Sequence, residues 1–274
     1  MEQSVAYIHL LFESVPLYLT AIRQRQAADD VHQLRVTLRR LKAGFSVLSF
    51  KEMTDDSGSD FAQLVSGLFT QAGKVRETQV NQALVNRKNV RYLEGYVAWQ
   101  KSAEQKYLKK LIAEMDQFDL AALERSEKEF YSRLSDLTQQ RLVMNALAFL
   151  KYRQEKITTL QHTRMSNHAL HKIRIQLKAM SDCQLLLKNL SSGAVLPVHY
   201  PPIKKLNKLV GAWHDEQVLV HSVKLFLRNK SRNKKQEPSL KKWVQRRDHA
   251  CRQKRRKIYQ TIRSLTGLYG HDRS

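Results

Sequence analysis

The sequence predicts an all-α protein built from two similar helical bundles. Only 9 Gly and 5 Pro occur in 274 residues, so helix-breaking residues are scarce and long helices are favoured. Apolar residues recur with helical spacing along most of the chain, and no alternating run indicates a sheet. Residues 31–43 are repeated, without a gap, by residues 170–182. We therefore expect one domain over 1–274, with a first bundle at about 1–120 and a second at about 121–274.

Four helices are expected in the first half. Their predicted ranges are 2–27, a segment ending near Lys51, 61–86 and 90–118. Asp29 or Asp30 is suited to cap the second of these helices, because a side-chain carboxylate can accept hydrogen bonds from the first turn. The polar residues 54–60 indicate a loop, and residues 119–123 indicate a linker in the middle of the molecule.

The second half repeats this order. Its predicted helices are 124–162 with a break, 168–190, 203–230 and 239–266. Ser166 or Asn167 is suited to cap the helix that carries the repeated motif. The proline-containing segment 191–202 and the basic segment 228–238 are expected to be loops between the last three helices.

Residues 31–48 place an apolar stripe beside a basic one. The apolar stripe is expected to face the core and contains Val31, Leu34, Leu38, Leu41, Phe45 and Leu48. The basic stripe, displaced by about 100°, contains His32, Arg35, Arg39 and Lys42. A row of charges that serves solvation alone would more often lie opposite the core. A row beside the core is expected to line a cleft between packed helices.

The repeat carries the same two stripes. His171, Arg174 and Lys178 align with His32, Arg35 and Arg39, and the apolar positions Leu170, Ile173, Ile175, Leu177 and Met180 are also matched. Residues 206–218 likewise repeat 68–80, with Gly211 matching Gly73 and Asp215 matching Glu77. We expect Gly211 to let a neighbouring helix approach closely. We infer that Glu77 and Asp215 pair with Arg or His of the motif helices and hold them in place, rather than perform chemistry.

The charge of the chain restricts its partners. A net charge of +23 favours binding to a polyanion, such as nucleic acid, anionic lipid or a phosphate polymer. No apolar run approaches the length of about 18 residues that a membrane-spanning helix needs. The 2 cysteines form no disulfide framework, which is typical of a reducing cytosol, so a cytoplasmic location is expected. Both cysteines, Cys183 and Cys251, are expected in the core.

Candidate chemistry is weighed against structural roles. Arg forks and Lys point charges along a track suit a phosphate chain, while the alternative is a solvated face with intrahelical ion pairs. His32 and His171 are read as phosphate donors when protonated, or as helix-pinning hydrogen-bond groups. The histidines do not converge with carboxylates or thiolates, so no metal is expected. No phosphate-cradling Gly-rich loop or constellation of inward carboxylates indicates an enzyme, and no cofactor is implied.

A third basic feature lies near the end of the chain. The last predicted helix is amphipathic, and Lys242, Arg246 and Arg256 on it either extend the polyanion track or form a solvated face. Lys101, Lys106, Lys109 and Lys110 are a weaker counterpart in the first half. Helical nucleic-acid binding is the alternative function, although no aromatic residues interleave with the basic rows to stack on unpaired bases.

Together these motifs resemble one known family. His-x-x-Arg-x-x-x-Arg/Lys at 32–39 and 171–178, each followed by Gly-x-x-x-(Glu/Asp)-x-Gln-Val, resembles the CHAD domain, the conserved histidine α-helical domain. The resemblance implies two four-helix bundles related by a pseudo-two-fold axis, and binding of inorganic polyphosphate along a basic surface and central cavity without catalysis. It also implies attachment to polyphosphate granules. Family members are usually basic where this chain has Ala179 and Ser181, so the two halves are expected to bind unequally.

The candidate polyphosphate-binding residues follow from these rows and from the basic residues beside them. They are His32, Arg35, Arg39, Arg40, Lys42, Lys74, Arg76, His171, Arg174, Lys178, Lys205, Lys208, Lys242 and Arg246.

Overall fold

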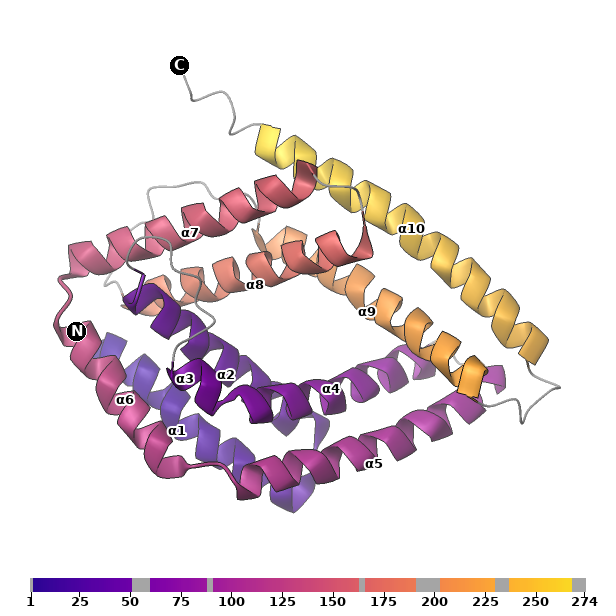
Figure 1. Cartoon of the computed structure of the whole chain (residues 1–274), viewed down its shortest axis with the longest axis horizontal. Helices are drawn as coiled ribbons and strands as arrows, with labels where there is room; N and C mark the ends of the chain where they lie inside the picture. Colours follow the sequence, from indigo (N-terminus) through magenta and orange to yellow (C-terminus); the bar gives the residue numbers. More distant parts are fainter. Residues whose placement is uncertain are drawn as a thin grey trace. The chain divides into compact units, whose positions relative to one another are not determined.

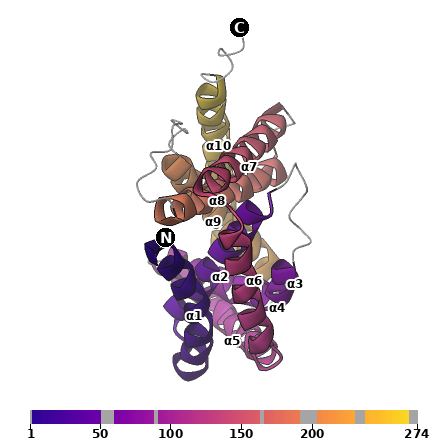
Figure 2. The ribbon, with the colours of Figure 1, turned by 90° about the vertical axis from the view of Figure 1, so that its left-hand side faces the viewer.

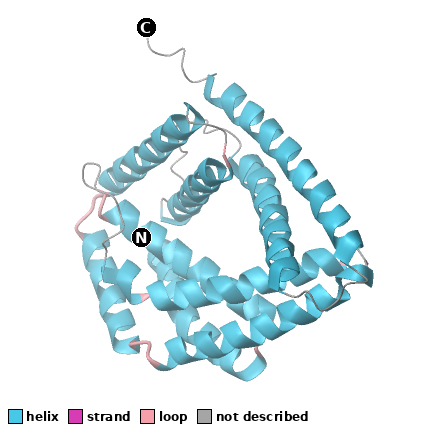
Figure 3. Cartoon of the chain, turned by 45° about the vertical axis from the view of Figure 1, so that its right-hand side comes forward, coloured by secondary structure: helices cyan, strands magenta, loops and turns pink. Residues whose placement is uncertain are grey.

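The computed structural model confirms the all-α fold class. It describes residues 2–50, 60–87, 91–162, 166–190, 203–229 and 237–267. Within these ranges the chain is almost entirely helical and contains no strand (Figure 3). Of the predicted loops at 54–60, 191–202 and 228–238, residues 54–59, 191–202 and 230–236 lie outside the described residues. The described ends of the first and last of these loops are helical instead, because Asp60 begins α3, residues 228–229 end α9 and residues 237–238 begin α10.

The helices follow the predicted order (Figure 1). They are α1 (Glu2–Arg25), α2 (Ala28–Leu48), α3 (Asp60–Leu64), α4 (Ser66–Asn86), α5 (Glu94–Asp116), α6 (Leu120–Ser135), α7 (Gln139–His162), α8 (Asn167–Leu190), α9 (Ile203–Asn229) and α10 (Glu237–Gly267). A short 3-10 helix, η2 (Arg91–Leu93), precedes α5. The predicted helices 61–86 and 90–118 are therefore each interrupted near their starts. The break predicted within 124–162 separates α6 from α7.

The helix caps agree with the sequence prediction at one of two positions. Ser166 caps α8, because its Oγ accepts a hydrogen bond of 3.0 Å from the backbone N–H of Ala169. The prediction for α2 is wrong: its N-cap residue is Ala27, which has no side chain able to accept such a bond. Asp29 and Asp30 lie instead in the first turn, where their charges face the positive end of the helix dipole.

The expected linker at 119–123 is mostly helix. Asp119 is the N-cap of α6, and its Oδ1 accepts a hydrogen bond of 2.9 Å from the N–H of Ala122. This bond, together with the ion pair between Asp119 and Arg125 at 3.0 Å, stabilises the start of the helix and lowers the pKa of Asp119. The connection between α5 and α6 is therefore shorter than the sequence indicated.

The chain divides into two compact units, each made of three segments. Unit 1 comprises Met1–Arg76, Lys106–Glu155 and Lys178–His199, and unit 2 comprises Glu77–Gln105, Lys156–Leu177 and Tyr200–Ser274. Four helices, α4, α5, α7 and α8, contribute residues to both units. The units therefore do not follow the order of the chain, and the sequential bundles predicted on either side of residue 120 stay a prediction.

Unit 1 has an aromatic core. In it α1, α2, α3 and α6 pack against one another, as Figures 1 and 2 show for α1, α2 and α6. Phe45 of α2 stacks on Phe61 of α3 at 4.8 Å between ring centroids, and its ring meets the edge of Phe130 of α6 at 5.0 Å. Phe12 of α1 contacts all three rings. The predicted apolar stripe of α2 is confirmed, since all six of its residues are buried.

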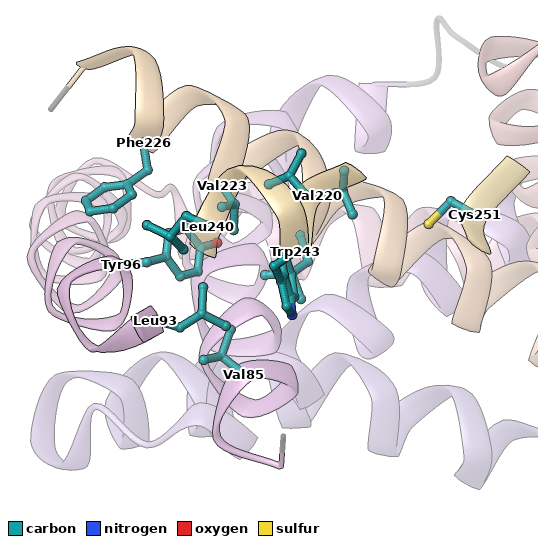
Figure 4. Packing of buried hydrophobic residues seen from close by; sticks show 11 residues of the cluster. Val85, Leu93, Tyr96, Val220, Val223, Phe226, Leu240, Trp243 and Cys251 are labelled. Carbon is teal, nitrogen blue, oxygen red and sulfur yellow. The ribbon is translucent and has the colours of Figure 1, made fainter. Parts of the chain in front are cut away.

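Unit 2 has a separate cluster of buried residues (Figure 4). It joins the end of α4, η2, the start of α5, and the facing sides of α9 and α10. Its members are Val85, Leu93, Tyr96, Leu219, Val220, Val223, Phe226, Leu240, Trp243, Val244 and Cys251. The predicted core position of both cysteines is confirmed, and burial raises the pKa of the Cys183 thiol far above its ordinary value.

The apolar stripe of α8 is confirmed. Leu170, Ile173, Leu177 and Met180 are buried. Ile175, which aligns with Val36 outside the stripe of α2, is 47% exposed. Ile175 lies two residues from both Ile173 and Leu177, so helical geometry points it away from the side that they bury.

A small residue at position 44 is required by the aromatic core. A Cβ atom added at Gly44 would lie 2.8 Å from Cε2 of Phe130, whose ring is held by Phe12 and Phe45. We expect Gly44→Ala to lower the free energy of unfolding by about 1–3 kcal/mol, because overpacking outweighs the gain in helix propensity. Gly211→Ala is the matched control, because no atom in the described part of the chain lies within 4 Å of a Cβ there. Urea unfolding followed by circular dichroism measures both; equal stability of the two variants would contradict the prediction.

Candidate polyanion-binding site

The basic row of α2 meets α4 in unit 1. Arg35 donates a hydrogen bond from Nη1 to the backbone carbonyl of Phe69, at 2.5 Å. Its guanidinium also lies over the Phe69 ring, 4.4 Å from the centroid, and Lys42 Nζ lies 5.5 Å from the same centroid. One aromatic residue of α4 therefore fixes the position of two cations of α2.

Gly73 makes room for Arg35. A Cβ atom at position 73 would collide with Nη1 of Arg35, so the absence of a side chain allows the guanidinium to lie against α4. The expectation for Gly211, its counterpart in the repeat, is wrong, because none of the described residues lies within 4 Å of a Cβ placed there. The same glycine in the two copies therefore has a packing role in only one of them.

The charges of three cations act on His32. Burial is the largest cause that lowers the pKa of His32 below its ordinary value. The positive charges of Arg76, Arg39 and Lys178 lower the pKa further, and Asp29 opposes them. These cations come from α4, α2 and α8, so three helices place positive charge around one imidazole in unit 1.

The interactions between α2 and α4 show the relative direction of the two helices. His32 interacts with Arg76, and Arg35 contacts both Gly73 and Phe69. Residue numbers therefore rise along α2 as they fall along α4, and the two helices are antiparallel. The predicted residues His32, Arg35, Arg39, Lys42, Arg76 and Lys178 are brought together by this arrangement.

Arg39 is engaged by a carboxylate that sequence reasoning missed. Its Nε and Nη2 donate to Oδ2 and Oδ1 of Asp182 at 2.5 and 3.2 Å. The Asp182 side chain is only 6% exposed, whereas that of Arg39 is 30% exposed. Arg39 therefore uses two of its N–H donors to hold α2 to α8. Its interaction with a ligand would be mainly electrostatic.

Two further candidates in unit 1 differ in exposure. Lys74 is exposed, and its Nζ lies 6.0 Å from the centroid of the Tyr107 ring on α5. Arg40 is half-buried, and its charge lowers the pKa of Tyr7, although burial of that phenol is the larger effect and raises it. Arg40 is therefore part of the packed interior side of α2, and Lys74 part of the solvent side of α4.

The second copy of the motif lies mainly in unit 2. The His171 ring lies 5.0 Å from the His214 ring, with an angle of 36° between the planes. His214 occupies the repeat position of Arg76, so the ring contact between His171 and His214 corresponds in position to the electrostatic interaction between His32 and Arg76. The duplication seen in the sequence is therefore also a duplication of interacting positions.

The other candidates of the second copy are less concentrated. Arg174 is half-buried in unit 2, but Lys178 belongs to unit 1. Asn207 Nδ2 donates to the carbonyl of Leu177 at 3.0 Å and ties α9 to α8, while Lys205 and Lys208 on the same helix are exposed. The shared basic cavity implied by the family resemblance stays a prediction.

Glu77 and Asp215, which were predicted to pair with Arg or His of the motif helices, both lie in unit 2. Glu77 reaches the surface, yet desolvation by the atoms around it raises its pKa, and the charge of His221 lowers it. Asp215 is half-buried on α9. Their pairing with the motif helices stays a prediction.

Two other kinds of site find no support in the structure. Among the described residues, no group of three or more His, Cys, Asp or Glu side chains could hold a metal ion. None of the described helices is long and apolar enough to cross a membrane.

Removing Arg39 tests the ion pair with Asp182. We expect Arg39→Ala to lower the free energy of unfolding by about 2–3 kcal/mol, because it leaves a buried carboxylate without its partner. The partial exposure of Arg39 keeps this value below that of a fully buried pair. Arg76→Ala, which removes a cation from the same cluster, should cost less than about 1 kcal/mol. Urea unfolding compares the two variants, and equal losses of stability would mean that the ion pair is not structural.

Comparisons with known proteins agree with the fold. The CHAD domain family model matches residues 6–224. The crystal structure of the CHAD domain from the plant Ricinus communis is similar over 96% of this chain and 91% of that chain, with a TM-score of 0.72 and 13% sequence identity. A search of curated proteins finds no match.

Proposed function

The chain belongs to the CHAD domain family, and on this basis we propose that it binds inorganic polyphosphate. Some members of this family bind polyphosphate. The observation that carries the proposal is the basic row of α2, in which Arg35 and Lys42 lie at the Phe69 ring of α4 and Arg39 is held by Asp182. The charges of Arg39, Arg76 and Lys178 also act on His32 in this row. A polyphosphate chain offers about one negative charge per unit and no base edges, so its recognition requires several closely spaced cations.

The electrostatics of the cluster favour an anionic ligand. Burial is the main cause of the lowered pKa of His32, and repulsion from the nearby positive charges lowers it further. A phosphate chain relieves this repulsion and releases its own counterions, so affinity should fall steeply with salt concentration.

Individual residues have different roles in this proposal. Arg76 and Lys42 make no ion pair within the described residues, so their charges are available to phosphate oxygens. Arg35 is oriented by Phe69, and Arg39 adds charge while it holds Asp182. We propose binding without hydrolysis, because these groups neutralise phosphate rather than activate a nucleophile. The proposed location is the cytoplasm and polyphosphate granules, as the family resemblance implies.

Charge reversal in the cluster tests the function. We expect Lys42→Glu/Arg76→Glu to weaken binding of long-chain polyphosphate by roughly tenfold for each phosphate that the variant no longer binds. The control Lys109→Glu/Lys110→Glu makes the same change in net charge on the exposed side of α5 and should leave affinity within about twofold. Isothermal titration calorimetry at fixed ionic strength measures both. If the control variant is weakened as much as the cluster variant, binding is a property of net charge alone, and the proposed site is wrong.

Gly73→Ala is a finer test that leaves every charge in place. The added methyl group should displace the Arg35 guanidinium from Phe69 and lower polyphosphate affinity. Gly211→Ala introduces the same change in the repeat without a clash and should not alter affinity.

Release of orthophosphate from polyphosphate by the pure protein would contradict the non-catalytic part of the proposal.

The titration of His32 should respond to polyphosphate. Because its folded-state pKa lies below the unfolded value of about 6.5, the unfolded chain takes up this proton first as the pH falls. His32 therefore removes stability from the free protein as the pH falls from about 6.5 towards the folded pKa. A bound phosphate chain favours the imidazolium, so binding should raise the pKa of His32 and affinity should increase as the pH falls below about 6.5. NMR titration of the His32 ring with and without polyphosphate measures the shift; an unchanged pKa would remove His32 from the site.

A further inference from the structure

The last helix, α10, has two opposite faces. Its inner face packs on α9 and η2 in unit 2 and buries Leu240, Trp243, Val244, Cys251 and Ile258. Figure 1 shows α10 (yellow) lying along α9 (orange). At about 100° per residue, the line through Lys242, His249, Gln253 and Gln260 lies about 180° from this inner face. All four of these side chains are exposed.

Cations lie on both sides of this line. Arg246 and Lys257 lie about 40–60° to one side, and Arg256, Arg263 and Arg252 lie about 40–80° to the other. These five side chains are also exposed. The outer face of α10, defined by these nine residues, therefore has a largely neutral, polar middle row between two cationic edges. This arrangement differs from α2, where the basic row lies beside the buried stripe.

The carboxylates of α10 are turned away from the outer face. Glu237 pairs with Lys241 at 2.6 Å, and Asp248 pairs with Lys224 of α9 at 3.1 Å and with Arg252 at 3.6 Å. By contrast, Lys242, Arg246, Arg256 and Lys257 make no ion pair within the described residues. The negative charge of the helix is therefore used in folding, and most of the positive charge of the outer face is not.

The arginines nearer the inner face are used in packing. Arg247 pairs with Glu216 of α9 at 3.5 Å and lies over the Trp243 ring, 5.7 Å from its centroid. Arg255 donates to Oδ1 of Asn167 at 2.5 Å. A basic composition that served only this packing would need these two arginines, but not the cations on the outer face.

We propose that the outer face of α10 binds double-stranded DNA, with the helix lying in the major groove. An α-helix with its side chains is about 10–12 Å across, and the major groove of B-form DNA is about 12 Å wide. In this position the two cationic edges face the phosphates of the two strands. The middle row, with His249 and two glutamines, faces the base edges, to which glutamine can donate and accept hydrogen bonds.

The composition of the face disfavours two other polyanions. An amphipathic helix that binds lipid buries an apolar face in the membrane, but the apolar face of α10 is already buried in unit 2. A polyphosphate chain has no base edges with which the neutral side chains of the middle row could form specific hydrogen bonds. The family model matches residues 6–224 and does not include α10, which begins at Glu237.

Charge reversal on the outer face tests the proposal. We expect Lys242→Glu/Arg246→Glu/Arg256→Glu/Lys257→Glu to weaken binding of a short mixed-sequence DNA duplex at least tenfold. The dependence of log affinity on log salt concentration should become shallower by about 0.9 for each phosphate that the variant no longer neutralises. Fluorescence anisotropy with a labelled duplex measures both quantities. Because all four residues are exposed, the circular dichroism spectrum and melting temperature should be unchanged; if they change, the corresponding glutamine substitutions replace the glutamates.

Two controls separate this surface from the polyphosphate site. Lys101→Glu/Lys106→Glu/Lys109→Glu/Lys110→Glu makes the same change in net charge on α5, at four exposed positions, and should leave DNA affinity within about twofold. The cluster variant Lys42→Glu/Arg76→Glu should bind DNA as the unchanged protein does. An RNA duplex, whose deep and narrow major groove excludes a helix, should bind more weakly than DNA.

The outcomes that overturn the proposal are distinct. Undiminished DNA binding by the α10 variant, or an equal weakening in the α5 control, shows that the outer face is not the DNA site. Weaker binding of polyphosphate or anionic vesicles by the α10 variant, with DNA binding intact, assigns the face to another polyanion. Unchanged polyphosphate binding by the cluster variant refutes the proposed function alone and leaves the DNA proposal standing.

Discussion

The ion pair between Arg39 and Asp182 is the interaction on which the cationic cluster depends. It joins α2 to α8 through two hydrogen bonds to a carboxylate that is almost fully buried. Lys178 lies about one turn before Asp182 on α8, so the same interaction keeps Lys178 near His32. A buried carboxylate is costly unless it is paired, and the pairing gives α2 and α8 one preferred register. The positive charges are therefore concentrated by a negative charge that solvent and ligand hardly reach.

Packing around Arg35 fixes the position of a second cation of α2 without a carboxylate. The guanidinium lies on the Phe69 ring, donates to the Phe69 carbonyl and occupies the space left by Gly73. An aromatic face and a carbonyl oxygen orient a cation but leave its full charge, which an ion pair would partly cancel. Arg39 and Arg35 thus show two ways of fixing a cation: one mainly supports the fold, and the other preserves charge for a ligand.

Periodicity predicted the core well because burial on a helix depends on spacing. Val31, Leu34, Leu38 and Leu41 are all buried, as their spacing required. The basic row was predicted for the same reason, since its members share one face of α2. Asp182 could not be predicted in this way, because it aligns with Ala43 in the first copy and the repeat gave no signal for a carboxylate. Its role follows from an interaction between residues 143 positions apart.

The two copies of the motif show why identical residues do not ensure identical sites. The interacting positions are retained, since His171 contacts His214 where His32 interacts with Arg76. However, Asn207 stands at the position of Phe69, and no described residue lies within 4 Å of a Cβ placed at Gly211, so the position that supports Arg35 in the first copy is not aromatic in the second. Replacing Arg76 with His214 also exchanges a permanent charge for one that depends on pH. The duplication therefore preserved the geometry of the helices and left the concentration of charge to the first copy, which should contribute more to anion binding at neutral pH.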